Sequence, residues 1–117
     1  GMTVNVQGWK VNIEPYQYIT TGVDDGEVVH VKKTFDVVES LAGLCFSKGL
    51  ELDVDGMFYA KKIADKIRGA GKAVIFDEKE MAHIRAAYAL LRGLPETFVE
   101  FLERIRDAQK IELTEGG

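Results

Sequence analysis

The spacing of apolar residues changes near Thr34, and this change constrains the fold more than any other feature of the sequence. Before it, apolar and polar residues tend to alternate, which is typical of strands with one buried face. After it, apolar residues recur at steps of three and four, as on one face of an α-helix. The sequence therefore predicts an α+β fold, mostly helical, in which about four helices pack with a small N-terminal antiparallel β-sheet or hairpin.

Residues 1–31 form the β-leaning part of the chain. Valines alternate with polar residues before Gln7-Gly8, and Trp9, Val11 and Ile13 alternate after it. Glycine supplies the positive φ that a tight turn needs, so this pattern predicts a hairpin that turns at Gln7-Gly8.

Asp24-Asp25-Gly26 is a second turn signal, because Asp and Gly favour the backbone angles of tight turns. Residues 16–21 before it and residues 28–31 after it are rich in β-branched and aromatic side chains. We expect both segments to be extended.

Residues 34–110 form the helical part. The clearest local signal is Asp77-Glu78-Lys79-Glu80, in which Asp77 is placed to cap a helix and Glu80 to reach back to it. Residues 111–117 are expected to be a frayed tail, and residues 1–117 to be a single domain. The predicted helices cover about residues 35–47 with Thr34 as N-cap, 53–68, 77–91 and 95–105.

Composition limits the classes of protein to which the chain could belong. With 46% apolar and 29% charged residues it has the composition of a folded globular protein. No apolar run approaches the roughly twenty residues that cross a bilayer, and no secretory signal is recognisable, so we expect a cytoplasmic protein without a membrane partner. The formal net charge of −4 argues against nucleic-acid binding by the molecule as a whole.

Catalytic and metal-binding patterns are weak. His30 and His83 lie in different predicted elements, and neither has a second histidine at metal-ligand spacing. Cys45 lies in an apolar helical pattern and is expected to be a buried small side chain. Asp53 and Asp55 resemble the start of a calcium loop, but the required glutamate at the twelfth position is missing. We therefore expect no enzyme, no metal and no cofactor.

One stretch concentrates positive charge on the predicted second helix. It has two interpretations: a surface that contacts phosphate or an acidic partner, or an ordinary solvated helix face. Aromatic residues that could stack on bases are not interleaved with it, which favours the second. The residues are Lys61, Lys62, Lys66, Arg68 and Lys72.

Trp9, Tyr16 and Tyr18 form an aromatic group near the predicted hairpin. Aromatic side chains often anchor interfaces, so they are candidates for contact with a partner. Packing of the sheet onto the helices explains them equally well.

The order of elements in residues 53–110 resembles small phage and prophage proteins encoded among head and tail genes. The resemblance rests on a Lys-rich helix (59–67), a short apolar lead-in (73–76), an acidic capped helix (77–91) and a final helix that starts with proline (95–105). It implies a structural or assembly-accessory role with self-association, and it carries over no catalytic residue.

The sequence therefore predicts a non-enzymatic protein-binding or assembly-accessory protein that acts as a homo-oligomer or binds a protein partner. One alternative is a small regulator that binds nucleic acid through the basic residues between 61 and 72. A second is a small-ligand-binding or enzyme domain that uses His30 or His83.

Overall fold

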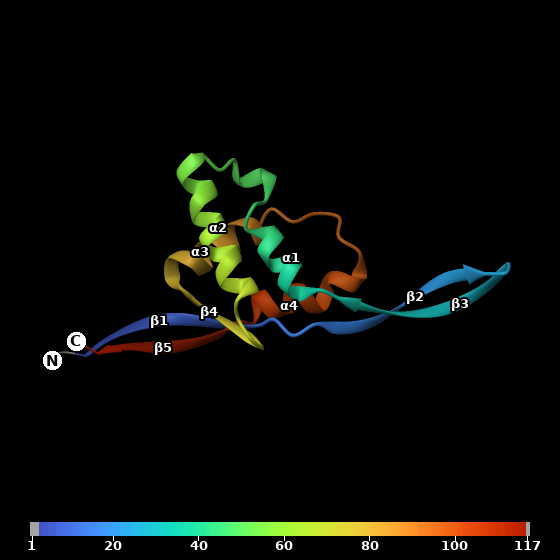
Figure 1. Ribbon diagram of the computed structural model, residues 1–117, viewed down its shortest axis with the longest axis horizontal. Coiled ribbons are helices and arrows are strands. Elements are labelled where there is room, and N and C mark those ends of the chain that lie inside the picture. Colours follow the sequence, from blue (N-terminus) through green and yellow to red (C-terminus); the bar gives the residue numbers. More distant parts are fainter. Residues whose placement is uncertain (1–2, 117) are drawn as a thin grey trace.

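The chain forms an elongated molecule in which a helical body lies in the middle and a two-stranded ribbon leaves it at each end (Figure 1). The structure is a computed structural model that describes residues 3–116, and the side chains of residues 6–114. Its principal extents are 69 × 29 × 22 Å. In chain order the elements are β1 (Thr3–Asn12), β2 (Tyr16–Asp24), β3 (Glu27–Phe35), α1 (Val37–Leu44), η1 (Lys48–Leu50), α2 (Val54–Arg68), β4 (Ala73–Asp77), α3 (Glu78–Tyr88), η2 (Glu96–Phe98), α4 (Val99–Arg106) and β5 (Gln109–Gly116).

The predicted α+β class is confirmed. Within residues 3–116 there are four α-helices and two antiparallel sheets, one of three strands and one of two. The larger sheet has the order β4-β1-β5, so it combines strands from the start, the middle and the end of the chain. The smaller sheet is the β2–β3 hairpin.

The predicted hairpin at Gln7-Gly8 is wrong, because β1 runs without a break through both residues. Gly8 pairs with Asp77 on one side and with Ile111 on the other. A Cβ at Gly8 would lie 2.7 Å from Leu113 Cδ1 and 3.3 Å from the Phe76 carbonyl oxygen. The glycine therefore permits close packing inside a sheet rather than a turn.

The change in alternation around Gly8 marks a change in the face of β1 that carries the apolar residues. Directly opposed residues of a sheet share a face. Val6 is opposite Leu113, whereas Val11 is opposite Val74 and is buried with it in the core. Because Val6 and Val11 differ by an odd number of positions, they lie on opposite faces of the strand.

The expectation of a frayed tail at 111–117 is also wrong for the described residues. Residues Gln109–Gly116 form β5, which pairs with β1 from Lys10↔Gln109 to Thr3↔Gly116. Pairing with β1 explains why this segment is a strand. It satisfies backbone hydrogen-bonding groups that only water would satisfy in a frayed tail. Residue 117 lies outside the described residues.

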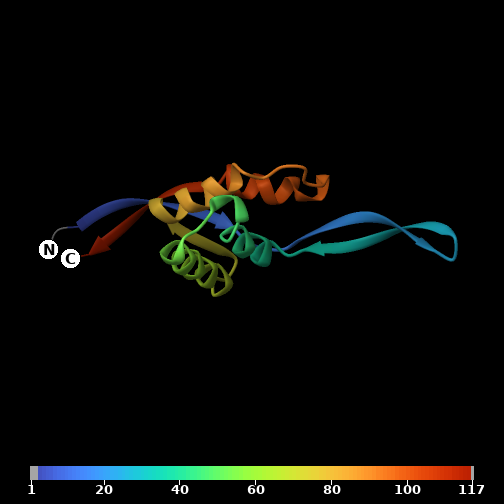
Figure 2. The same cartoon turned by 90° about the horizontal axis from the view of Figure 1, so that it is seen from above.

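The second predicted turn is confirmed. Asp25 and Gly26 join β2 to β3 with φ angles of +50° and +79°. Two successive positive φ angles are typical of the tight turns that match the twist of a hairpin. Figures 1 and 2 show this hairpin projecting away from the helices.

The starts of α1 and α2 can be compared with the helix starts that the sequence predicts. α1 begins at Val37 with Asp36 as its N-cap, which accepts a hydrogen bond from Glu39 N at 3.0 Å. The predicted start with Thr34 as N-cap is wrong, because Thr34 lies in β3. α2 begins after Asp53 and ends at Arg68, as expected, with Gly69 as its C-cap.

The core lies between the helices and one face of the three-stranded sheet. Cys45 is fully buried in it, as expected. The apolar face predicted for the second helix is also buried. The core includes Val11, Val74 and Phe76 from the sheet and Leu41, Ala60, Ile63, Ala64, Ile67, Met81, Ile84, Phe101 and Ile105 from the helices.

The predicted capping box at the start of α3 is confirmed and is tied to α2. Glu80 N donates to Asp77 Oδ1 at 2.7 Å, and Asp77 N donates to Glu80 Oε1 at 2.9 Å. Lys66 Nζ of α2 donates to the same Glu80 oxygen at 2.8 Å. Glu80 is only 3% exposed, so this carboxylate joins the cap of α3 to α2 in a partly dry environment.

Glu80→Ala is expected to lower the free energy of unfolding by about 1–2 kcal/mol, because it removes the capping carboxylate and leaves Asp77 N and Lys66 without it. Glu78→Ala is the control, since Glu78 is exposed in the same helical turn. Chemical denaturation followed by circular dichroism measures both. Equal losses in the two variants would contradict the role assigned to Glu80.

Candidate interaction surface

The β2–β3 hairpin is the most unusual feature of the molecule. We call residues 17–34 the arm; Tyr16 and Phe35 form its root. Among residues 3–116, β2 and β3 pair only with each other, so the described chain gives the arm no third strand. An isolated two-stranded ribbon is marginally stable in water, and stability normally requires a third strand or a packed helix.

The root holds the arm firmly to the helical body. The Tyr16 and Phe35 rings stack with centroids 4.8 Å apart, and Phe35 meets Phe98 edge to face at 4.9 Å. The Tyr16 hydroxyl donates to the Thr97 carbonyl at 2.7 Å and accepts from Phe101 N at 3.2 Å. These contacts fix the direction in which the arm leaves the body.

One face of the arm presents apolar side chains to solvent. Val23 is directly opposite Val28, and Ile19 is opposite Lys32, so all four side chains share this face. Ile19, Val23 and Val28 are 68%, 76% and 71% exposed. We call these three residues the open face of the arm.

Charges frame the open face. Lys32 lies beside Ile19 toward the root, and the turn beyond Val23 and Val28 carries Asp24, Asp25 and Glu27. Within the described part of the chain none of these charged residues is in an ion pair. The arm is therefore basic toward its root and acidic at its tip.

A second exposed apolar cluster lies at the start of α2. Val54, Met57 and Phe58 are 72%, 47% and 71% exposed, and we call them the α2 patch. Their spacing of three and four residues places them on one side of the helix. Surface helices usually present polar residues on this side.

The basic residues of α2 and the loop after it are mostly paired with carboxylates. Lys66 meets Glu80 at 2.8 Å and Arg68 meets Glu39 at 3.0 Å. Lys72 lies 4.0 Å from Glu14, and Lys61 is paired with Asp65. Lys62 lies 6.0 Å from the centre of the Tyr59 ring. Interleaved acids reduce the positive potential that phosphate binding would need.

The structure separates Trp9 from Tyr16 and Tyr18, which the sequence analysis had grouped with it. Trp9 lies in the three-stranded sheet, with Arg85 over its ring at 4.3 Å and Lys110 at 5.5 Å. Tyr16 and Tyr18 lie in β2, where both pack against the core. Tyr16 is used to anchor the arm, and Trp9 is half-buried under two cations.

The histidines and the cysteine are not brought into one site. His30 is exposed on the arm, while His83 Nε2 donates to the Cys45 carbonyl at 2.8 Å. Over the described residues, no group of three or more His, Cys, Asp or Glu side chains is placed to hold a metal ion. Nor does any helix among them combine the length and apolarity needed to span a membrane.

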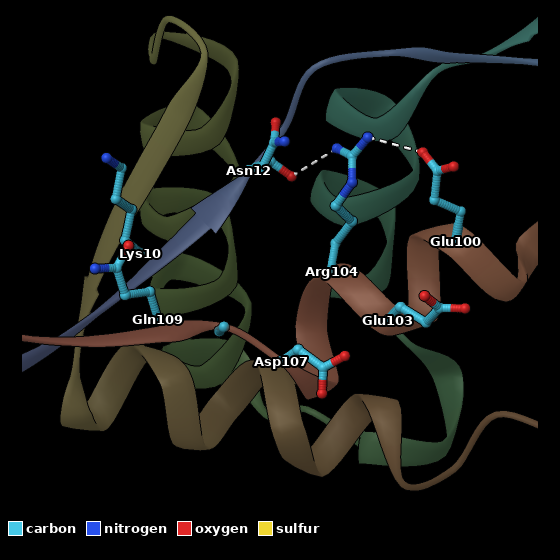
Figure 3. A pocket seen from close by; sticks show the side chains of 8 residues that line it. Lys10, Asn12, Glu100, Glu103, Arg104, Asp107 and Gln109 are labelled. Carbon is cyan, nitrogen blue, oxygen red and sulfur yellow. Dashed lines mark hydrogen bonds and ion pairs between the residues drawn. The ribbon is translucent and has the colours of Figure 1, made fainter.

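A hollow with a volume of about 300 Å³ lies between β1, α4 and the start of β5 (Figure 3). Its central cation is Arg104, whose Nη1 donates to the carbonyls of Asn12 and Glu14 at 3.1 and 2.9 Å. Arg104 Nη2 donates to Glu100 at 2.9 Å. The guanidinium therefore fastens the loop after β1 to α4, and the hollow offers a ligand little free hydrogen-bonding capacity on this cation.

Comparisons with protein families, with curated proteins and with solved structures find no match for this chain. The candidate surface is therefore interpreted from its own residues. The open face was missed at the sequence level because Val28, Val29 and Val31 indicated a strand without showing which side would be covered. The sequence signal that could have revealed the open face is that apolar residues occur on both faces of this predicted strand.

Tyr16→Phe is expected to lower the free energy of unfolding by about 1–2 kcal/mol, because Thr97 O and Phe101 N each lose a partner. Tyr18→Phe is the matched control, since its hydroxyl makes no hydrogen bond in the described part of the chain. Denaturant unfolding of the two variants measures the difference. A larger loss for Tyr18→Phe would overturn the role of Tyr16.

Cys45 is expected to react with a thiol reagent near neutral pH only after unfolding. Burial raises the pKa of its thiol to about 11, so folding favours the protonated form. That preference is fully present below the ordinary pKa of a thiol and is lost as the pH rises through about 11. Labelling with and without denaturant tests this. Rapid labelling of the folded protein would contradict the buried placement.

Proposed function

We propose that the protein is a non-enzymatic assembly protein that self-associates through the arm. The observation that carries this proposal is the open face, where Ile19, Val23 and Val28 project into solvent from a ribbon without a third strand. Exposed apolar side chains on a projecting element are typical of surfaces that are covered in a complex.

A second copy of this chain is the partner that the charges favour. Lys32 and Lys33 of the arm are exposed and carry no ion pair in the described part of the chain. These lysines favour contact with an acidic partner. A second copy of this chain is acidic, because its formal net charge is −4. The open edges of β2 and β3 add hydrogen-bonding groups that a second copy could satisfy.

The proposal includes the broader assignments drawn from the sequence. We propose an assembly role of the kind implied by the resemblance to phage and prophage proteins, in the cytoplasm, without a metal or cofactor. Nucleic-acid binding through the α2 basic residues is the weaker alternative, because four of the five have a carboxylate within 4.0 Å.

Light scattering over a concentration series tests self-association. The wild-type protein is expected to be an oligomer that persists at raised salt, because apolar contact contributes most of the binding. Val28→Lys is expected to shift it to monomer, since a charge would be placed in the apolar contact.

Gln7→Lys is the control, because it adds the same charge to an exposed strand residue of the other sheet. It is expected to assemble like the wild type. A wild-type protein that stays monomeric at every concentration, or a Val28→Lys variant that assembles normally, would refute the proposal.

A further inference from the structure

The α2 patch has the chemistry to receive the arm of another copy. Val54, Met57 and Phe58 present a broad apolar side of a helix that no other part of the described chain covers. The open face of the arm likewise has three large exposed apolar side chains, and the exposed Thr21 and His30 lie between Ile19 and Val23 on the same face. Burial of both would remove apolar area from water on each partner at once.

The charges around the two surfaces match in order. Asp53 and Asp55 lie at the start of α2, and Lys61 and Lys62 lie one to two turns further along the same exposed side. The arm has the opposite order, with Lys32 near its root and an acidic turn at its tip. If the arm lies along α2 with its tip toward Lys62, each charged end faces the opposite sign.

The separations of the charges on the two surfaces differ by about 6 Å, a gap that long side chains can close. From Asp55 to Lys62 the helix rises about 10 Å, at 1.5 Å per residue. From Lys32 to Glu27 the strand extends about 16 Å, at roughly 3.3 Å per residue. The lysine side chains at both ends span the remaining few ångströms, so both charge contacts can form while the apolar residues meet between them.

One copy cannot make this contact with itself. The arm leaves the body at one end and points away from the helices, whereas α2 begins on the far side of the helical body (Figure 1). The root contacts of Tyr16 and Phe35 hold the arm in this direction. A contact between arm and patch therefore requires two copies.

We propose that the α2 patch is the acceptor for the arm of a second copy, which gives a head-to-tail assembly. This inference rests on the proposed function, since it names the surface that covers the arm. Because arm and patch are different surfaces, a pair of copies joined by one contact still has one free arm and one free patch. Such a contact propagates into a ring or a filament rather than stopping at a two-fold dimer.

A mixing experiment tests this geometry. Val28→Lys removes the donor but keeps the patch, and Phe58→Lys removes the acceptor but keeps the arm. Each variant alone is expected to be monomeric. Their mixture is expected to form a one-to-one heterodimer of twice the monomer mass, because the intact arm of one binds the intact patch of the other.

Val99→Lys is the matched control, because it places the same charge on another exposed apolar helix residue that lies in α4. It is expected to assemble like the wild type. Circular dichroism of all three variants verifies that each is folded, which their exposed positions favour.

Charge reversal gives an independent measurement. Lys32→Glu is expected to weaken association about tenfold, and adding Asp55→Lys in the same chain is expected to restore it. Asp55 is chosen because Asp53 is the N-cap of α2 and its loss would disturb the helix.

The outcomes separate the two proposals. If Phe58→Lys assembles like the wild type while Val28→Lys is monomeric, the arm mediates self-association but the α2 patch is not its acceptor. If both variants are monomeric and their mixture stays monomeric, head-to-tail pairing is also overturned. A monomeric wild-type protein would refute both proposals.

Discussion

The backbone pairing of β1 on both of its edges is the constraint on which the rest of the structure depends. β4 pairs with its inner half and β5 pairs along most of its length, so a single strand joins the start, the middle and the end of the chain. One face of this sheet supplies Val11, Val74 and Phe76 to the core that the helices cover. The other face stays open, which is why Lys10 and Ile75 are exposed. Pairing at this sequence separation has a high entropic cost that the buried core must offset.

The end of β1 also determines where the arm begins. Only three residues separate Asn12 from Tyr16, so the arm starts from a point that the sheet has already fixed. Arg104 donates to the carbonyl of Asn12 at the end of β1 and to that of Glu14 in the loop, and its guanidinium lies 5.6 Å from the centre of the Tyr16 ring. Arg104, which lines the hollow, thus helps to hold the start of the arm in place. A projecting hairpin with a rigid root loses less conformational entropy on binding than a flexible one.

Local signals in the sequence predicted local structure well, and they failed where distant segments pair. Asp53, Asp77 with Glu80, and Asp25-Gly26 act within four residues, so their caps and turn could be read directly. Gly8 has a role only when Leu113 is placed beside it, and nothing near residue 8 reveals that neighbour. β5 is polar at alternate positions and has few strand-forming residues. Its pairing therefore depends on the edge that β1 offers, and not on the intrinsic strand propensity of its own residues. The open face was hidden for the same reason, since exposure is a property of the whole fold.

The charges on the arm explain how such a surface avoids indiscriminate pairing. An exposed ribbon with apolar side chains and free edges is a template for aggregation unless charged residues discourage it. Asp24, Asp25 and Glu27 at the tip repel another tip, and Lys32 and Lys33 repel another root when two arms align in parallel. An antiparallel pair of arms would escape this repulsion, because each acidic tip would lie beside the lysines of the other arm. The helix α2, which carries acids at its start and lysines further on, also places opposite charges beside those of the arm, so the charges that discourage parallel pairing of two arms favour contact with α2.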